Sequence, residues 1–99
     1  MQEAVFAAVV RALERGDRAA LVTIVATSGS TPQRVGAKML VHEDGHTIGT
    51  IGGGCYENDA CGKAREIIRT RRGRVVRYEL SDDLAAENGL ICGGQMEVF

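Results

Sequence analysis

The chain has 99 residues, of which 44% are hydrophobic and 25% are charged, and its formal net charge is −1 at pH 7. These values fit one ordinary globular domain over residues 1–99, and the balanced charge gives no reason to expect nucleic acid or an anionic membrane as a partner. No apolar stretch approaches the roughly 20 residues of a membrane span, and three cysteines without secreted context favour reduced thiols in the cytoplasm.

The first half of the chain predicts one helix and three strands. Apolar residues recur at helical spacing up to Leu13, and Gly16 follows as a C-cap. The next apolar run is rich in β-branched residues, which is typical of a strand buried on both faces. In chain order we expect a helix over residues 2–15, a strand over 19–26, a loop over 27–36, and a hairpin of strands over 37–42 and 47–51.

The second half predicts a long helix followed by two strands. In chain order we expect the helix from after Cys55 to about Arg72, a strand over 74–80, a short helix over 81–86 and a last strand over 90–99. Two main helices and about five strands without strict βαβ alternation indicate an α+β or mixed α/β domain with a mixed sheet. The last strand would leave an open sheet edge, which a second copy or a partner domain could cover.

A cysteine after three glycines is the most informative local feature. Cys55 follows Gly52, Gly53 and Gly54 and lies at or just before the start of the predicted helix. The unpaired N–H groups there would lower the pKa of the thiol and favour the thiolate, which ligates metals or attacks electrophiles. The glycines suit a cradle of N–H groups for a phosphate or another oxyanion. A small buried cysteine at a sharp, closely packed turn explains the same residues equally well.

Two further segments are candidate ligand sites. Cys92 precedes two glycines; alone it is typical of a buried strand cysteine, and beside Cys55 it is a second thiol candidate. The loop over residues 27–32 follows a buried strand, and its hydroxyls, with Arg34 and Lys38 nearby, could hold an oxyanion. Hydroxyls that cap the backbone of their own loop are the alternative.

The remaining titratable residues are weaker candidates. Glu57 and Asp59 could orient a ligand or act as a base, although carboxylates at a helix start are more often simple dipole partners. Cys61 lies on the apolar stripe of the helix and is expected in the core. His42 and His46 flank a turn, and we do not expect them to hold a metal.

Three long motifs occur in this chain in one order. They are residues 27–41 (TSGSTPQRVGAKMLV), residues 48–57 (IGTIGGGCYE) and residues 82–99 (DDLAAENGLICGGQMEVF). Together they resemble the N-terminal domain of the XdhC/CoxI family, the xanthine dehydrogenase accessory proteins. The resemblance implies a maturation factor that binds molybdenum cofactor, holds it during sulfuration and helps to pass it to the apoenzyme of a molybdenum hydroxylase, such as xanthine or carbon monoxide dehydrogenase.

The resemblance also implies a set of site residues. The cofactor carries a pterin, a phosphate and a molybdenum dithiolene group, so Cys55 is the leading candidate for the molybdenum or sulfur contact and Cys92 is the second. A chaperone of this kind needs no catalytic residue, and a sulfur donor is a further possible partner. The residues expected to bind the cofactor are Cys55, Cys92, Gly52, Gly53, Gly54, Glu57, Ser28, Ser30, Thr31 and Arg34, with Cys55 as the metal contact.

Two other functions stay open at this point. A sulfur-transfer or thiol-redox enzyme needs a reactive thiolate and a base, and only His42 and His46 supply an imidazole. A structural subunit that covers a partner's sheet edge would need neither glycine-flanked cysteine. Typical family members continue into a dinucleotide-binding domain that we expect to be absent here, so a homodimer or a separate dinucleotide-binding partner is expected.

Overall fold

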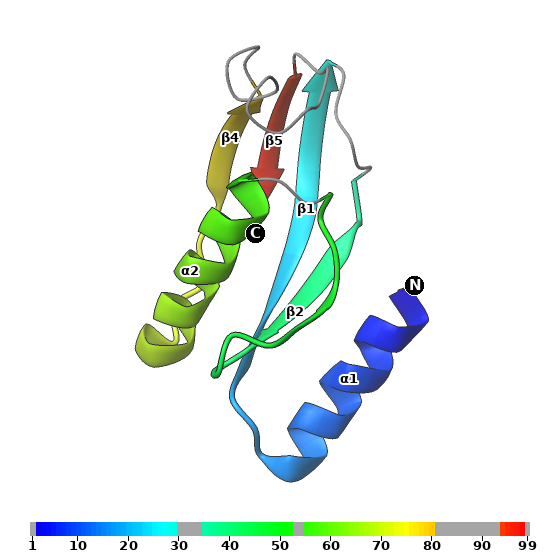
Figure 1. Ribbon diagram of the computed structural model, residues 1–99. Helices are drawn as coiled ribbons and strands as arrows, with labels where there is room; N and C mark the ends of the chain where they lie inside the picture. Colours follow the sequence, from blue (N-terminus) through cyan, green and yellow to red (C-terminus); the bar gives the residue numbers. More distant parts are fainter. Residues whose placement is uncertain (1, 30–34, 53–54, 81–93, 99) are drawn as a thin grey trace.

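Five strands form one sheet, and a helix packs against each of its faces (Figure 1). The computed structural model describes residues 2–29, 35–52, 55–80 and 94–98. The two helices and five strands of this part of the chain confirm the α+β fold that the sequence predicts. In chain order the elements are α1 (Gln2–Arg15), β1 (Ala19–Gly29), β2 (Lys38–His42), β3 (Thr47–Gly49), α2 (Cys55–Thr70), β4 (Val76–Leu80) and β5 (Gly94–Val98).

The sheet is antiparallel throughout. Its strand order is β3-β2-β1-β5-β4, and every neighbouring pair runs antiparallel. The expectation of a mixed sheet is therefore wrong: α2 connects β3 to β4, but these strands lie at opposite edges of the sheet, so the crossover creates no parallel neighbours. The last strand is not at an edge either. It lies between β1 and β4, because β1 runs on beyond the part that pairs with β2.

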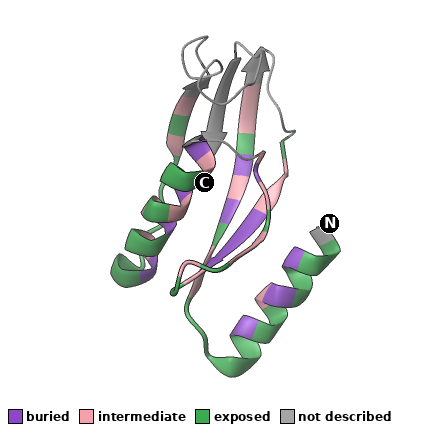
Figure 2. Ribbon diagram, viewed as in Figure 1, coloured by how far each residue is buried: buried purple, intermediate pink, exposed green. Residues whose placement is uncertain are grey.

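The strand β2 divides the core into two clusters. Met39 and Val41 are fully buried against Tyr56 of α2 on one face of the sheet. Leu40, which lies between them, packs against Val5 of α1 on the other face. Successive side chains of a strand point to opposite faces, so this short strand carries a small core on each side (Figure 2).

The strand β1 is buried on one face only. Val22 and Ile24 are 6% and 0% exposed and join the core under α2. Leu21 and Val25, on the other face, are 38% and 44% exposed. The helix on that face, α1, packs over β2 and β3, so it leaves much of β1 uncovered (Figure 1). The expectation that this strand is buried on both faces is wrong for this reason.

Both helices end at a residue with a left-handed backbone. Gly16 has φ 70° and ends α1, which confirms the predicted C-cap. The second helix begins at Cys55 and ends at Thr70, slightly earlier than the sequence predicts, because Arg71 adopts φ 58°.

Two expectations fall outside the described residues. These are the short helix over residues 81–86 and the flanks of the last strand, residues 90–93 and 99. Within the described part of the chain, neither helix has the length and apolar character to cross a membrane.

Candidate functional site

One end of the sheet brings together three strand ends. Gly29, the last residue of β1, is the register partner of Gly94, the first residue of β5. Gly94 is in turn the partner of Leu80, the last residue of β4. The strand ends from which the segments 30–34 and 81–93 continue therefore lie side by side, at the top of the view in Figure 1.

The first turn of α2 contacts β4 through two aromatic rings. Tyr56 is 2% exposed, and its ring centroid lies 6.1 Å from that of Tyr78 in β4. Tyr78 is two residues from the end of its strand, in one row of the sheet with Met96 and Thr27. The first turn of α2, which follows the glycine run, is thus linked to β4 through the rings of Tyr56 and Tyr78.

A carboxylate in the first turn of α2 anchors the segment that leads into the glycine run. Oε2 of Glu57 accepts a hydrogen bond from Oγ1 of Thr50 at 2.7 Å and another from the backbone N–H of Ile51 at 3.1 Å. The N–H of Gly52 donates to Oγ1 of Thr50 at 2.9 Å. Glu57 therefore positions the backbone at the start of the glycine run. Its carboxylate oxygen Oε2 already accepts hydrogen bonds from two donors of the protein itself.

Glycines near this segment have structural reasons of their own. Gly49 has φ 86°, and a Cβ there would lie 2.6 Å from both the carbonyl oxygen of Lys38 and Cγ2 of Val5. Gly52 has φ 121°, a conformation that side chains rarely adopt. Backbone fit alone therefore requires glycine at two positions on the approach to the predicted site.

The structure describes part of the predicted site. It bonds Glu57 to the backbone of Ile51, the residue before Gly52, and it makes Cys55 the first residue of α2, where unpaired N–H groups favour a negative charge. The backbone of Ser28 pairs with Gln95 in the sheet. The side chains of Ser28 and Cys55 lie outside the described set, as do the whole residues Gly53, Gly54, Ser30, Thr31, Arg34 and Cys92.

Lys38 serves its own loop. Its Nζ donates to the carbonyl oxygen of Gly36 at 2.9 Å. Lys38 therefore gives the oxyanion hypothesis no support in the part of the loop that the structure describes.

A polar cluster beside the first turn of α2 was missed by the sequence reasoning. The hydroxyl of Tyr78 donates to Oδ2 of Asp59 at 2.5 Å, and Nζ of Lys63 donates to the same oxygen. The hydrogen bond from Lys63, followed by that from Tyr78, lowers the pKa of Asp59. Burial, followed by the bond to Asp59, raises the pKa of Tyr78. The spacing of Asp59 and Lys63 by four residues was readable as a helical ion pair, but nothing in the sequence pointed to Tyr78.

The other titratable candidates behave as core and turn residues. Cys61 is half-buried against the core cluster under α2, as predicted, and burial, followed by the charge of Glu57, raises its pKa. The rings of His42 and His46 lie 5.5 Å apart beside the turn. Among the described residues, no three histidine, cysteine or acidic side chains are grouped so that they could hold a metal ion.

Known proteins are similar to this chain in sequence and fold. The sequence profile of the XdhC and CoxI family matches residues 12–79. The molybdenum cofactor insertion chaperone PaoD of Escherichia coli (strain K12) is 42% identical over 69 residues, which are 70% of this chain and 22% of PaoD. A protein of Bacillus subtilis (strain 168) that is named as a probable subunit of xanthine dehydrogenase is 33% identical over 88 residues, which are 87% of this chain and 27% of that protein.

A solved structure agrees with these matches. The crystal structure of a xanthine dehydrogenase from Bacillus halodurans has a TM-score of 0.75 and 35% sequence identity to this chain, over 91% of its residues and 28% of the solved chain. The chain thus spans about a quarter of the length of each of these three proteins. Since the family profile covers more than half of the chain and these relatives share the same region, the chain belongs to the XdhC and CoxI family.

Proposed function

We propose that this chain binds molybdenum cofactor as part of an accessory protein and helps to deliver it to the apoenzyme of a molybdenum hydroxylase. In this proposal the cofactor is cargo, held while its molybdenum gains sulfur from a donor and then released to the enzyme. The chain acts as a chaperone and needs no catalytic residue of its own.

The observation that supports the proposal is the pairing of two motif-bearing strand ends at one end of the sheet. The register of Gly29 with Gly94 places the end of β1 beside the beginning of β5, and Tyr56 in the first turn of α2 packs on Tyr78 of the next strand, β4. In the sequence, the hydroxyl-rich loop follows β1, Cys92 comes just before β5, and Cys55 is the first residue of α2. A group with a phosphate at one end and a metal–sulfur centre at the other needs both kinds of donor in one place.

The chemistry of each segment supports a role. The start of α2 favours the thiolate of Cys55, a soft ligand suited to molybdenum. The glycine run follows a segment that Glu57 anchors, and its N–H groups beyond that of Gly52, which already bonds to Thr50, suit the phosphate or the pterin. Cys92 supplies a second sulfur, and Ser28, Ser30, Thr31 and Arg34 supply further donors. PaoD, at 42% identity, is itself named as a molybdenum cofactor insertion chaperone.

Delivery tests the proposal. The chain, loaded anaerobically with molybdenum cofactor, is mixed with a molybdenum hydroxylase prepared without its cofactor, and the recovered hydroxylase activity is followed over time. We expect the loaded chain to restore more activity than the same amount of free cofactor, because the bound cofactor is shielded from oxidation and hydrolysis. Equal recovery from free and bound cofactor would exclude a role in delivery.

Two cysteine variants locate the contact. We expect Cys55→Ser to reduce recovery to the level of free cofactor, because the soft ligand is lost. Cys61→Ser is the matched control, since Cys61 is a half-buried cysteine of the same helix that packs on the core. If hydroxylase activity is recovered in full with Cys55→Ser but not with Cys61→Ser, Cys55 is not part of the site.

A further inference from the structure

A hydroxyl and a carboxylate join the two sides of the glycine run. Oγ1 of Thr50 donates a hydrogen bond to Oε2 of Glu57 at 2.7 Å, so two side chains that are seven residues apart are linked directly. In the sequence, Gly52, Gly53 and Gly54 lie between them. We call this pair the Thr50–Glu57 clip.

The clip also engages the backbone that leads into the run. The N–H of Ile51 donates to Oε2 of Glu57 at 3.1 Å, and the N–H of Gly52 donates to Oγ1 of Thr50 at 2.9 Å. The hydroxyl of Thr50 therefore donates one hydrogen bond and accepts another, which a methyl group in its place could not do. Two of the three bonds go to a carboxylate, and such bonds are stronger than those between neutral groups.

Buried side chains fix the chain on both sides of the run as well. Ile51, directly before it, is 0% exposed, and Tyr56, directly after Cys55, is 2% exposed. Both side chains belong to the core cluster under α2. Residues 52–55 therefore lie between two points that are held by the core and joined by the clip.

Fixed ends matter for a run of glycines. Glycine loses more conformational freedom on ordering than any other residue, so a ligand that orders such a run pays a large entropic cost. A segment whose ends are already fixed has fewer conformations to lose. A ligand that contacts the run should therefore bind more tightly when the clip is intact.

We propose that Thr50 and Glu57 are positioning residues for the cofactor, an inference that rests on the function proposed above. The clip restricts the glycine run before molybdenum cofactor binds, and Glu57 acts through the clip rather than as a ligand. The two hydrogen bonds that Oε2 of Glu57 accepts from the protein support this role. Sequence reasoning expected Glu57 to bind the cofactor and gave Thr50 no role.

Variants of Thr50 test the proposal through cofactor affinity. The dissociation constant is measured anaerobically by centrifugal ultrafiltration, with molybdenum and pterin quantified on both sides of the filter. We expect Thr50→Val to weaken binding about tenfold, because valine keeps the branched shape of threonine but lacks the hydroxyl. Thr50→Ser should bind like wild type, because it keeps the hydroxyl.

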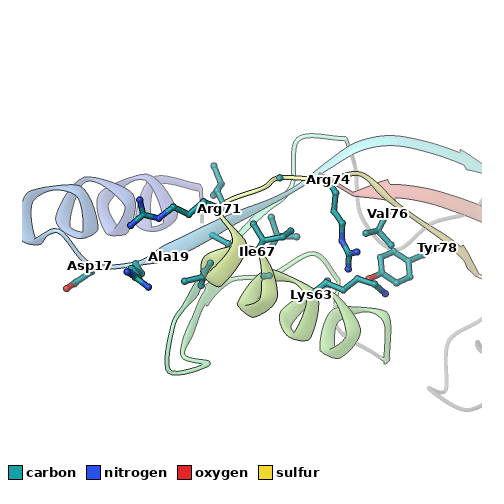
Figure 3. Close-up of a pocket in the computed structure, with 16 residues that line it drawn as sticks. Asp17, Ala19, Lys63, Ile67, Arg71, Arg74, Val76 and Tyr78 are labelled. Atoms are coloured by element: carbon teal, nitrogen blue, oxygen red, sulfur yellow. The ribbon is translucent and has the colours of Figure 1, made fainter.

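Tyr78→Phe is the matched control. The hydroxyl of Tyr78 also donates to a carboxylate of α2, that of Asp59, but it does so from β4, where Figure 3 shows Tyr78 beside Lys63. We expect Tyr78→Phe to lower the free energy of unfolding and to leave the cofactor affinity of the folded protein unchanged. Equal affinity of Thr50→Val and wild type, or equal losses of affinity in Thr50→Val and Tyr78→Phe, would overturn the positioning role.

A double variant separates positioning from direct contact. Thr50 and Glu57 belong to one clip, so the effects of their substitutions should not add. We expect Thr50→Val to change the cofactor affinity of the Glu57→Gln protein by less than about twofold. Additive losses would show that Glu57 contacts the cofactor itself and would overturn its positioning role.

Amide hydrogen exchange tests the clip without any cofactor. We expect Thr50→Val to speed exchange at Gly52 about fivefold or more, because its N–H loses its acceptor, and to leave exchange at Leu40 in β2 unchanged. Unchanged exchange at Gly52 would overturn the clip, and faster exchange at both positions would show a general loss of stability instead of positioning. Failure of wild type to bind the cofactor would overturn the proposed function together with this inference, whereas the outcomes named for Thr50→Val would overturn the inference alone.

Discussion

At the scale of single residues, Glu57 links the helix start to the glycine run. One carboxylate oxygen accepts bonds from Thr50 and from the backbone of Ile51. Hydrogen bonds to an ionised carboxylate are stronger than those between neutral groups. The backbone before Gly53 is therefore set by a side chain that lies beyond the run, in the first turn of α2.

Removing this charge should weaken the fold. We expect Glu57→Gln to lower the free energy of unfolding by about 1–2 kcal/mol. The amide oxygen of glutamine is a poorer acceptor than a carboxylate oxygen, and the NH₂ group of the amide cannot accept the hydrogen bonds of Thr50 and Ile51. Urea denaturation followed by circular dichroism measures the change. Glu66→Gln is the control, because Glu66 is an exposed residue of the same helix with one distant ion pair. Equal stability of Glu57→Gln and wild type would show that the anchor contributes nothing.

The bond between Asp59 and Tyr78 should make stability depend on pH at both extremes. The folded state lowers the pKa of Asp59 below 3.8, so its contribution is present above that value and is lost as the pH falls below it. The folded state raises the pKa of Tyr78 above 10.0. The contribution of Tyr78 to stability is therefore present below pH 10 and is lost as the pH rises through the folded pKa. We expect the stability advantage of wild type over Tyr78→Phe to be greatest between about pH 4 and pH 10.

Urea denaturation over a pH series measures this advantage. Asp59→Asn separates the two limbs, because it should abolish the acid limb while Tyr78 still titrates at high pH. If the difference in free energy of unfolding between wild type and Tyr78→Phe stays constant across the pH series, the hydrogen bond between Asp59 and Tyr78 is not the source of the pH dependence.

At the scale of elements, the hairpin of β2 and β3 and the helix α1 meet at one glycine. Gly49 pairs with Met39 across the hairpin and lies against Val5 of α1. A side chain at this position would meet the backbone of β2 and the core side chain of α1 at once. The approach of α1 to the sheet therefore depends on the absence of a single methyl group.

A pair of glycine substitutions tests this close approach. We expect Gly49→Ala to lower the free energy of unfolding by about 2–4 kcal/mol, because it combines a strained φ with overpacking. Gly62→Ala should raise it by about 0.5–1 kcal/mol, because a Cβ at this exposed helical position meets nothing within 4 Å. Thermal unfolding of both variants measures the changes, and equal effects of the two substitutions would contradict the packing argument.

At the scale of the whole molecule, local signals predicted the elements and failed to predict their arrangement. The apolar spacing of residues 2–15 and the glycine after them are local features, and α1 forms there as expected. The place of β5 between β1 and β4 depends on pairing between strands that are far apart in the sequence. The exposure of Leu21 and Val25 depends on where α1 lies on the sheet, and no local pattern encodes either fact.

The candidate site shows the same division. The sequence singled out Glu57 from its place at a helix start, and Asp59 and Lys63 have a readable helical spacing. It could not show that Glu57 bonds back to Thr50, nor that Tyr78 reaches Asp59 from a strand 19 residues away. Contacts between distant segments follow from the register of the sheet and the packing of α2, which single-sequence patterns do not determine.

The central claim is that this chain binds molybdenum cofactor through Cys55 and the glycine run before it. The most direct measurement is retention: the reduced chain is mixed anaerobically with molybdenum cofactor and passed over a desalting column, and molybdenum and pterin are quantified in the protein fraction. We predict stoichiometric retention by wild type and by Cys61→Ser, with a marked loss for Cys55→Ser and a smaller loss for Cys92→Ser. Absence of molybdenum and pterin from the wild-type fraction would contradict the claim.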